Sequence, residues 1–255
     1  MIAISLQSGS NGNCIYVETG GVRLLFDAGI SGVAAKERLA AHGRDIRSVD
    51  AVIISHDHGD HVRCAGIYQR KYGIPLYVTP KTIDRACSRL SLGKLKDVRH
   101  FRAGDTLRFS GVSVKTIPTP HDSEDGTVFV ITANNKRLGI MTDLGHVFEG
   151  LEQVVAGLDA AFIESNYDPD MLENGPYPAF LKQRIRSAGG HISNIEAAEL
   201  LRIAASPRMK WACLAHLSEQ NNSPDLALRT HREAGRKGLP VHVASRYGVS
   251  GLFTV

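Results

Sequence analysis

The chain has 255 residues, of which 43% are hydrophobic and 22% charged, and its formal net charge is +4. This length and composition predict a globular protein with one full core, so we expect a single domain over residues 1–255. A membrane-spanning protein is excluded, because no apolar stretch approaches the roughly 20 residues needed to cross a bilayer.

The N-terminus and the cysteines bear on the cellular compartment. Residues 1–13 contain no basic region followed by an apolar stretch, so no signal peptide is expected. Cys14, Cys64, Cys87 and Cys213 form no CxxC pair and fit thiols in a reducing environment. We therefore expect a cytoplasmic protein without a membrane partner. Its mild basicity is compatible with a polyanionic partner and does not require one.

The first 30 residues predict β-strands around the segment SGSNGN at positions 8–13. Ser10, Asn11 and Asn13 in this segment are candidate phosphate ligands, because hydroxyl, amide and turn N–H groups can bind anions. A Gly/Asn hairpin turn explains the same residues equally well.

A cluster of metal-type ligands follows the next predicted strand. His56, His58, Asp60 and His61 lie within six residues, directly after the apolar run at 51–54, which predicts a buried strand. Alternation in an extended loop turns His56 and His58 the same way, whereas Asp60 and His61 come one turn later and face a second point. Imidazoles and carboxylates suit zinc, and manganese and iron also accept them. The spacing therefore predicts two metals side by side.

Strand–helix alternation is expected over about residues 33–90. After the ligand cluster, the residues from Val62 onward predict a helix that is stopped by Gly73 and Pro75. A β-rich block follows at 107–141, and alternation resumes from Val147 to the end. Strands followed by strand–helix units therefore occur twice along the chain.

A further histidine lies between two predicted helices. The glycine pair at 189–190 ends one helix, and Ser193 with Glu196 predicts a capping box for the next. His191 is therefore expected just outside a helix N-terminus, where anions bind. A histidine packed against a helix cap is the alternative reading.

Three basic residues precede this histidine closely. Lys182, Arg184 and Arg186 are candidates for contacts to backbone phosphates. An ordinary basic surface helix explains them equally well.

The ligand cluster resembles the HxHxDH signature of the metallo-β-lactamase superfamily. The resemblance implies an α/β fold, an αββα sandwich of two mixed β-sheets flanked by helices, with the ligands in loops along one edge. It also implies a ligand set, each member of which follows an apolar run. His56, His58 and His121 would hold the first metal, Asp60, His61 and His216 the second, Asp143 would bridge them, and Asp27 would orient the metal-binding loop.

This ligand set favours hydrolysis. Two divalent transition metals, zinc or manganese with iron as a third option, can hold a bridging hydroxide at neutral pH and polarise an ester or phosphodiester oxygen. Oxygen-reducing diiron relatives carry Glu in place of the second histidine, and here that position is His58. Asp60 is present as a second-metal ligand, so we count it among the expected catalytic residues.

His191 resembles the histidine of the GH-S/T element in the phosphodiesterase branch, which includes tRNase Z. In that branch the histidine protonates the leaving oxygen or contacts the phosphate. We therefore expect His191 to act as general acid, and Ser193 and Asn194 to be candidate phosphate ligands.

Within that branch the chain resembles the YycJ/WalJ-like group of proposed 5′→3′ DNA exonucleases. The resemblance implies a nucleic-acid substrate, DNA rather than RNA, and leaves the oligomeric state open. The alternatives are a glyoxalase II-like hydrolase of small esters or thioesters, a small phosphodiesterase, and a metal-carrying scaffold that binds nucleic acid without cutting it. The resembling segments are SGSNGNC at 8–14, ESNYDPDML at 164–172, GPYP at 175–178, GGHISN at 189–194 and AHLSEQNN at 215–222.

Overall fold

The computed structural model describes residues 1–255, which form two compact units. None of the helices is both long enough and apolar enough to cross a membrane. Unit 1 comprises Met1–Pro118, Ser123–Thr127 and Ser245–Thr254, and unit 2 comprises Thr119–Asp122, Val128–Ala244 and Val255.

Unit 1 is built on a seven-stranded mixed sheet in the order β14-β1-β2-β3-β4-β5-β6. Strands β14, β1, β2 and β3 are antiparallel neighbours, whereas β3, β4, β5 and β6 run parallel. Strands β7 and β8 form an antiparallel hairpin. The strands are β1 (Ile2–Gln7), β2 (Cys14–Thr19), β3 (Val22–Phe26), β4 (Ala51–Ile53), β5 (Leu76–Val78), β6 (Val98–His100), β7 (Thr106–Phe109), β8 (Val112–Pro118) and β14 (Phe253–Thr254).

Local sequence signals mark the beginning or the end of three helices of unit 1. Ser31 caps the first helix, and Thr79 caps the fourth, which has a proline at its first position. Gly73 ends the third helix with a φ of 72°, as the sequence predicted. These helices are α1 (Gly32–Ala40), α2 (Gly59–Val62), α3 (Ala65–Tyr72) and α4 (Pro80–Arg89), with a 3₁₀ turn at Ile46–Ser48.

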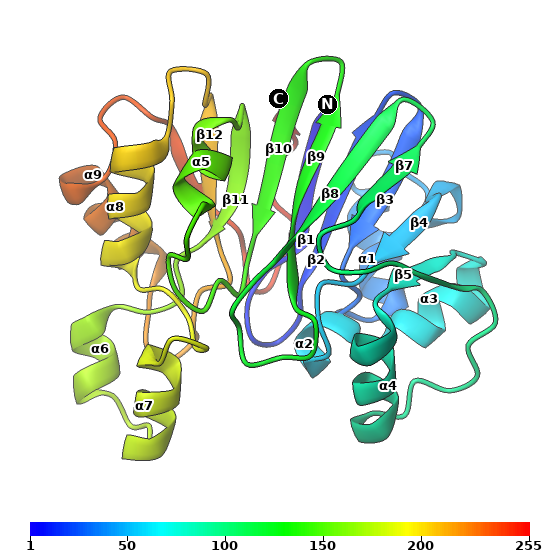
Figure 1. The fold of residues 1–255 in the computed structure, drawn as a ribbon, viewed down its shortest axis with the longest axis horizontal. Helices are drawn as coiled ribbons and strands as arrows, with labels where there is room; N and C mark the ends of the chain where they lie inside the picture. The colour runs from blue at the N-terminus through cyan, green and yellow to red at the C-terminus, as the bar shows by residue number, and fades with distance from the viewer. The chain divides into compact units, whose positions relative to one another are not determined.

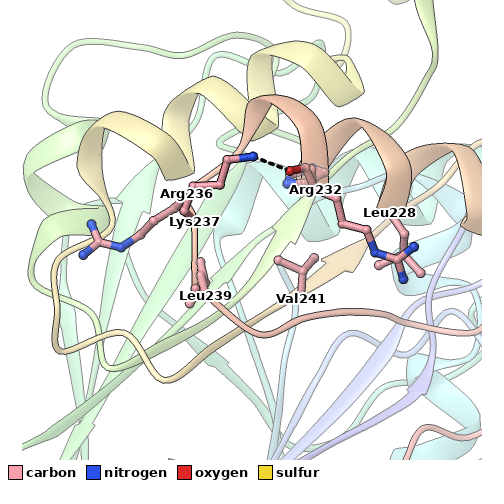
Figure 2. Close-up of a pocket in the computed structure, with 8 residues that line it drawn as sticks. Leu228, Arg232, Arg236, Lys237, Leu239 and Val241 are labelled. Atoms are coloured by element: carbon pink, nitrogen blue, oxygen red, sulfur yellow. Dashed lines mark hydrogen bonds between the residues drawn. The ribbon is translucent and has the colours of Figure 1, made fainter.

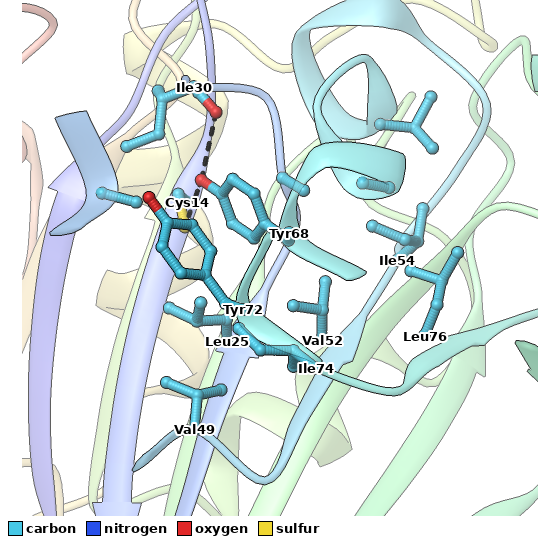
Figure 3. Close-up of a cluster of buried hydrophobic side chains, with 14 of the residues drawn as sticks. Cys14, Leu25, Ile30, Val49, Val52, Ile54, Tyr68, Tyr72, Ile74 and Leu76 are labelled. Carbon is cyan, nitrogen blue, oxygen red and sulfur yellow. Dashed lines mark hydrogen bonds between the residues drawn. The ribbon is translucent and has the colours of Figure 1, made fainter. Parts of the chain in front are cut away.

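Helices α1, α3 and α4 pack on the sheet of unit 1 through one apolar cluster (Figure 3). Tyr68 from α3 is fully buried there, and its hydroxyl donates to the carbonyl of Ile30 at 3.1 Å. The buried Cys14 also belongs to this cluster, and burial raises the pKa of its thiol far above the ordinary value. This cysteine is therefore part of the core and carries no reactive thiolate.

Unit 2 repeats the same order of strands. Strands β9 and β10 are antiparallel, and β10, β11, β12 and β13 are parallel neighbours. Helices α8 and α9 lie side by side (Figure 1). The elements are β9 (Thr127–Ala133), β10 (Lys136–Met141), α5 (Leu151–Ala156), β11 (Ala160–Glu164), α6 (Pro169–Asn174), α7 (Ala179–Arg186), α8 (Asn194–Ala204), β12 (Trp211–Ala215), α9 (Pro224–Ala234) and β13 (Val241–Val243).

Two mixed β-sheets with flanking helices confirm the predicted fold class. One local expectation differs from the structure. The helix expected from Val62 onward is two helices, because the short α2 starts earlier, at Gly59, and the chain breaks before α3. The amide of Cys64 at this break donates to the carbonyl of Ala28 at 2.9 Å, a contact outside the helix.

Candidate metal-binding and catalytic site

The predicted ligand cluster of unit 1 is compact. Strand β4 is entirely buried and delivers His56 at its carboxyl end, followed by His58, which caps α2. The ring of His56 lies 4.7 Å from that of His58 and 4.1 Å from that of His61, measured between centroids. His56 and His61 are buried, and His58 is half-buried. Three imidazoles therefore meet at the end of one strand.

Asp27 contacts two residues of this loop. It follows β3, the strand parallel to β4, and its backbone is left-handed with a φ of 66°. One carboxylate oxygen accepts from the amide of Ser55 at 2.8 Å, and the other lies 2.7 Å from Nδ1 of His61. A proton on Nδ1 would be donated to this carboxylate, which would leave the lone pair on Nε2 of His61 as a possible ligand.

The candidate phosphate ligands of the SGSNGN loop have different surroundings. Asn13 is buried, and its Nδ2 lies 3.0 Å from Nε2 of His61 and 3.3 Å from a carboxylate oxygen of Asp60. Asn13 therefore lies against the expected ligands. Ser10 is exposed, and the half-buried Asn11 accepts from Nη1 of Arg246 at 3.3 Å. These two residues lie on the open side of the loop, beside a guanidinium.

Unit 2 brings a second group of ligands together at the carboxyl ends of neighbouring parallel strands. Asp143 follows β10, Glu164 ends β11 and His216 follows β12. Asp143 and His216 have left-handed backbones, with φ values of 57° and 56°. With His191, these residues offer ligand atoms that all lie within 4.8 Å of one another.

Glu164 is the central residue of this group, and the sequence analysis assigned it no role. It is wholly buried, and its Oε1 lies 2.7 Å from Nδ1 of His191 and 3.3 Å from Nδ1 of His216. Its Oε2 accepts from the amide of Leu144 at 2.9 Å. Burial by itself would raise the pKa of Glu164, but the charges and hydrogen bonds of the two histidines hold that pKa well below its usual range. Glu164 is therefore a carboxylate that orients two imidazoles.

His191 and His121 lie in the same group. The ring centroid of His191 is 5.0 Å from that of His121 and 5.2 Å from that of His216. The side chain of His191 is 15% exposed, so it lies at the edge of the protein interior. Nδ1 of His121 lies 2.9 Å from the carbonyl oxygen of Gly190, and its Nε2 lies 3.6 Å from Asp143.

Ser193 and Asn194 have other partners. Ser193 caps α8, and Glu196 completes the predicted capping box. The Asn194 side chain is fully buried, where it accepts from Ser165 at 2.6 Å and donates to Asn222 at 2.9 Å. Neither side chain could bind a phosphate without giving up these bonds, so we exclude both from the phosphate-binding proposal.

Asn166 is a second residue that the sequence analysis did not assign. Its Nδ2 donates to the carbonyl oxygen of His216 at 2.8 Å and approaches Nδ1 of the same residue at 3.3 Å. It therefore supports the left-handed backbone at His216. The available signal was its position, two residues beyond the end of a buried strand.

The chemistry of these donors fits divalent metal ions. Neutral imidazole and carboxylate are the ligands that zinc and manganese accept. Nδ1 of His61, His121 and His216 each lies close to a carboxylate or carbonyl oxygen, which is how metal-binding histidines are usually oriented. Nε2 is then the atom that remains for a metal.

A basic hollow at the end of α9 is separate from these ligands (Figure 2). It measures about 220 Å³, and Arg232, Arg236 and Lys237 line it. The ammonium group of Lys237 donates to the carbonyl of Arg232 at 2.8 Å, so it closes the end of the helix. None of the predicted ligands lines this hollow.

Residues 22–216 match the family model described as the Beta-lactamase superfamily domain. The chain is 36% identical over 227 residues to the exodeoxyribonuclease WalJ of Streptococcus pneumoniae, covering 88% of this chain and 84% of that protein. It is 35% identical over 224 residues to the exodeoxyribonuclease YycJ of Bacillus anthracis, covering 87% and 84%.

Two solved structures resemble the chain over its length. The metallo-β-lactamase fold protein YhfI of Bacillus subtilis has a TM-score of 0.74 at 17% identity, covering 98% of both chains. Zinc-bound PqqB of Methylobacterium extorquens has a TM-score of 0.73 at 20% identity, covering 100% of both chains. At these identities the likeness concerns the fold alone.

Proposed function

Because the chain belongs to the β-lactamase superfamily domain family, with its metallo-β-lactamase fold, we propose that it is a metal-dependent phosphodiester hydrolase of nucleic acid. More specifically, we propose a 5′→3′ exonuclease of DNA that acts in the cytoplasm. Two relatives that are 36% and 35% identical to this chain over the aligned residues are named exodeoxyribonucleases, and this supports a nucleic-acid substrate.

We propose that two divalent metals, zinc or manganese with iron as a third option, are held as the sequence pattern predicts. The support is the order of the ligands along the chain and the orientation of the imidazoles within each unit. When bound, the ions would supply a Lewis acid and lower the pKa of a water molecule. His56, His58 and His121 would hold the first ion, Asp60, His61 and His216 the second, and Asp143 would bridge.

The pair formed by Glu164 and His191 is the observation that carries this proposal. The carboxylate of Glu164 lies 2.7 Å from Nδ1 of His191 and orients the ring, so that Nε2 is the atom we propose as the proton donor. When the oxygen of a hydroxide, formed from water by loss of a proton to solvent, attacks phosphorus, the bond from phosphorus to the leaving sugar oxygen breaks, and the sugar oxygen takes the proton from His191. A sugar alkoxide needs such a proton, whereas the thiolate released from a thioester does not, so the pair favours phosphodiesters over glyoxalase II-like substrates.

For phosphate binding we propose the open side of the SGSNGN loop. Ser10 is exposed there, and Asn11 lies next to the guanidinium of Arg246. A hydroxyl, an amide and a cation together suit a phosphate of the substrate backbone.

The test combines metal analysis with DNA degradation. We expect about two transition metals per chain and metal-dependent loss of nucleotides from 5′-phosphorylated DNA duplexes labelled at one end. Asp143→Ala and His61→Ala should abolish hydrolysis and reduce bound metal while leaving the circular-dichroism spectrum intact. His242→Ala, in an exposed histidine on β13, is the matched control. One ion per chain, or cleavage of thioesters but not of DNA, would overturn the proposal.

A further inference from the structure

Helix α7 presents an aromatic side chain to solvent. Phe180 leaves 74% of its surface exposed, more than any other large exposed hydrophobic side chain of the protein, the next being Tyr247 at 69%. Burying an exposed phenyl ring yields a large free-energy gain, so such a ring is a candidate for contact with a ligand. Its neighbours along the helix show where it lies.

One face of α7 is already used for packing. Leu181 and Ile185, four residues apart, join a small apolar cluster with Tyr167 and with Leu172 from α6, which lies beside α7 (Figure 1). Phe180 lies outside this cluster. In a helix, residues four apart share a face, so Phe180 lies on the same face as Arg184.

That face is directed towards the ligands of unit 2. The guanidinium of Arg184 forms two hydrogen bonds with the carboxylate of Asp122, at 2.6 and 3.0 Å. Asp122 follows His121, and its carboxylate lies 3.5 Å from Nε2 of that histidine. The face of α7 that carries Phe180 and Arg184 is therefore in contact, through Arg184, with the loop that carries His121, a proposed metal ligand.

The carboxyl end of α7 is also joined to the proposed general acid. The amide of His191 donates to the carbonyl of Ile185 at 2.9 Å, and the amide of Gly190 donates to the carbonyl of Ser187 at 2.8 Å. Phe180 precedes Ile185 by five residues, which places it about 8 Å along the helix axis from this attachment. A nucleotide next to the phosphate served by His191 would lie within that distance.

We propose that Phe180 is a stacking platform for an unpaired nucleobase of the substrate, next to the phosphate that is cleaved. This rests on the proposed nuclease function and assigns it a base-binding subsite. The residues of α7, AFLKQRIR, include three cations and no acidic side chain; Arg184 pairs with Asp122 and Arg186 with Glu173, and the basic helix suits a polyanion carrying flat bases. A phenyl ring stacks on any base, so the subsite binds nucleic acid without reading its sequence.

The first experiment measures binding by the metal-loaded protein. The probe is a 5′-phosphorylated DNA with a single-stranded end, non-cleavable linkages and 2-aminopurine near the terminus. Phe180→Ala should weaken binding by roughly 5- to 150-fold and remove the fluorescence change of the stacked base, whereas Phe180→Trp should keep both. Ile203→Ala, in an exposed residue of α8, is the control and should change neither. Because Phe180 is exposed, its variants are expected to melt at the wild-type temperature.

The second experiment measures binding of wild type and of Phe180→Ala to a DNA in which the proposed stacked nucleotide is abasic. If the ring stacks on the missing base, its removal should weaken wild-type binding as much as Phe180→Ala does. Phe180→Ala should then bind the abasic DNA no more weakly than wild type does. Additive losses, or equal binding by wild type and Phe180→Ala, would overturn the stacking proposal. An altered oligomeric state of Phe180→Ala with unchanged DNA binding would also overturn it, in favour of a protein contact. If wild type neither binds nor degrades DNA, the proposed function itself fails.

Discussion

Glu164 keeps its negative charge in a buried position because two imidazoles face it. We expect Glu164→Gln to retain the fold, since glutamine has nearly the same volume, and to lower activity or metal affinity by roughly 10- to 100-fold, as for other residues that orient metal ligands. Metal content and the kinetics of DNA degradation check this. The control is Glu199→Gln, which removes only an exposed ion pair with Arg202. If the Glu164 variant matches this control, Glu164 has no orienting role.

His191 allows a test that separates acid catalysis from phosphate binding. Without its general acid, His191→Ala should keep both metals and lower kcat by roughly 10²- to 10⁴-fold on DNA, whose sugar oxygen is a poor leaving group. The loss should be much smaller on a p-nitrophenyl phosphodiester, whose leaving group departs without a proton. Equal losses on the two substrates would indicate phosphate positioning instead.

The family resemblance implied roles for Asp27, Asp143 and His216, each of which follows an apolar run, and in the structure each comes directly after or close to the carboxyl end of a strand. Glu164 has the same signal, but its meaning depends on His191 and His216, which lie 27 and 52 residues away. Only the fold brings these side chains into contact. The same holds for Asn194, whose buried partner Asn222 is 28 residues distant, so local sequence does not reveal that bond.

At the scale of elements, the ligand helix α2 is joined to the loop after β3 by close backbone contacts. The amide of Ala28 donates to the carbonyl of His61 at 2.7 Å, and the amide of Asn13 donates to the carbonyl of Asp60 at 2.8 Å. A Cβ atom on Gly29 would lie 1.6 Å from that Asp60 carbonyl oxygen. Only glycine at position 29 allows the loop after β3 and the backbone of α2 to approach this closely.

We therefore expect Gly29→Ala to displace α2, with a loss of stability of about 1–3 kcal/mol or more and reduced metal binding. Gly111→Ala is the matched control, because a Cβ there would meet nothing within 4 Å. Chemical unfolding and metal analysis of both variants check this. A Gly29 variant with wild-type stability and metal content would show that α2 shifts without cost.

The limits of α2 were not predictable from the helical pattern. Periodicity and Gly73 correctly predicted where α3 ends. The break before α3 arises because the amide of Cys64 donates to the carbonyl of Ala28, in a loop 36 residues earlier. Local sequence does not reveal a hydrogen bond between residues so far apart, so the sequence pattern predicts one continuous helix.

At the scale of the whole molecule, both units contain antiparallel strands followed by parallel strands with helices. The sequence showed this repeated order because buried parallel strands such as β11 and β12 are continuous apolar runs. It did not show where one unit ends, since residues 245–254 belong to unit 1 with the N-terminal strands.

Stability of the whole protein should depend on His231. This residue of α9 is buried, its Nδ1 has no hydrogen-bonding partner, and burial lowers its pKa to about 4. The unfolded chain, with an ordinary histidine pKa near 6.5, binds this proton more readily. Stability should therefore fall as the pH drops below about 6.5, by about 2 kcal/mol between pH 7 and pH 5 from this group alone.

Urea unfolding at pH 7 and pH 5 tests this, with His231→Gln as the variant that cannot take up the proton. Between pH 7 and pH 5, the loss in free energy of unfolding should be about 2 kcal/mol smaller for the variant than for wild type. An identical pH dependence would mean that His231 is protonated in the folded protein without penalty.

Selection for heat resistance alone would favour replacement of the residues with left-handed backbones at positions 27, 143 and 216. Each holds a Cβ atom in a backbone conformation that glycine adopts more easily, at a cost of about 1 kcal/mol per residue. Glycine at these positions would relieve that backbone strain, but it would also delete the carboxylate of Asp27, which accepts from the Ser55 amide, or the side chains of Asp143 and His216. A directed-evolution campaign would therefore have to screen for hydrolysis or metal retention in every round, because relief of strain at these positions removes the proposed ligands.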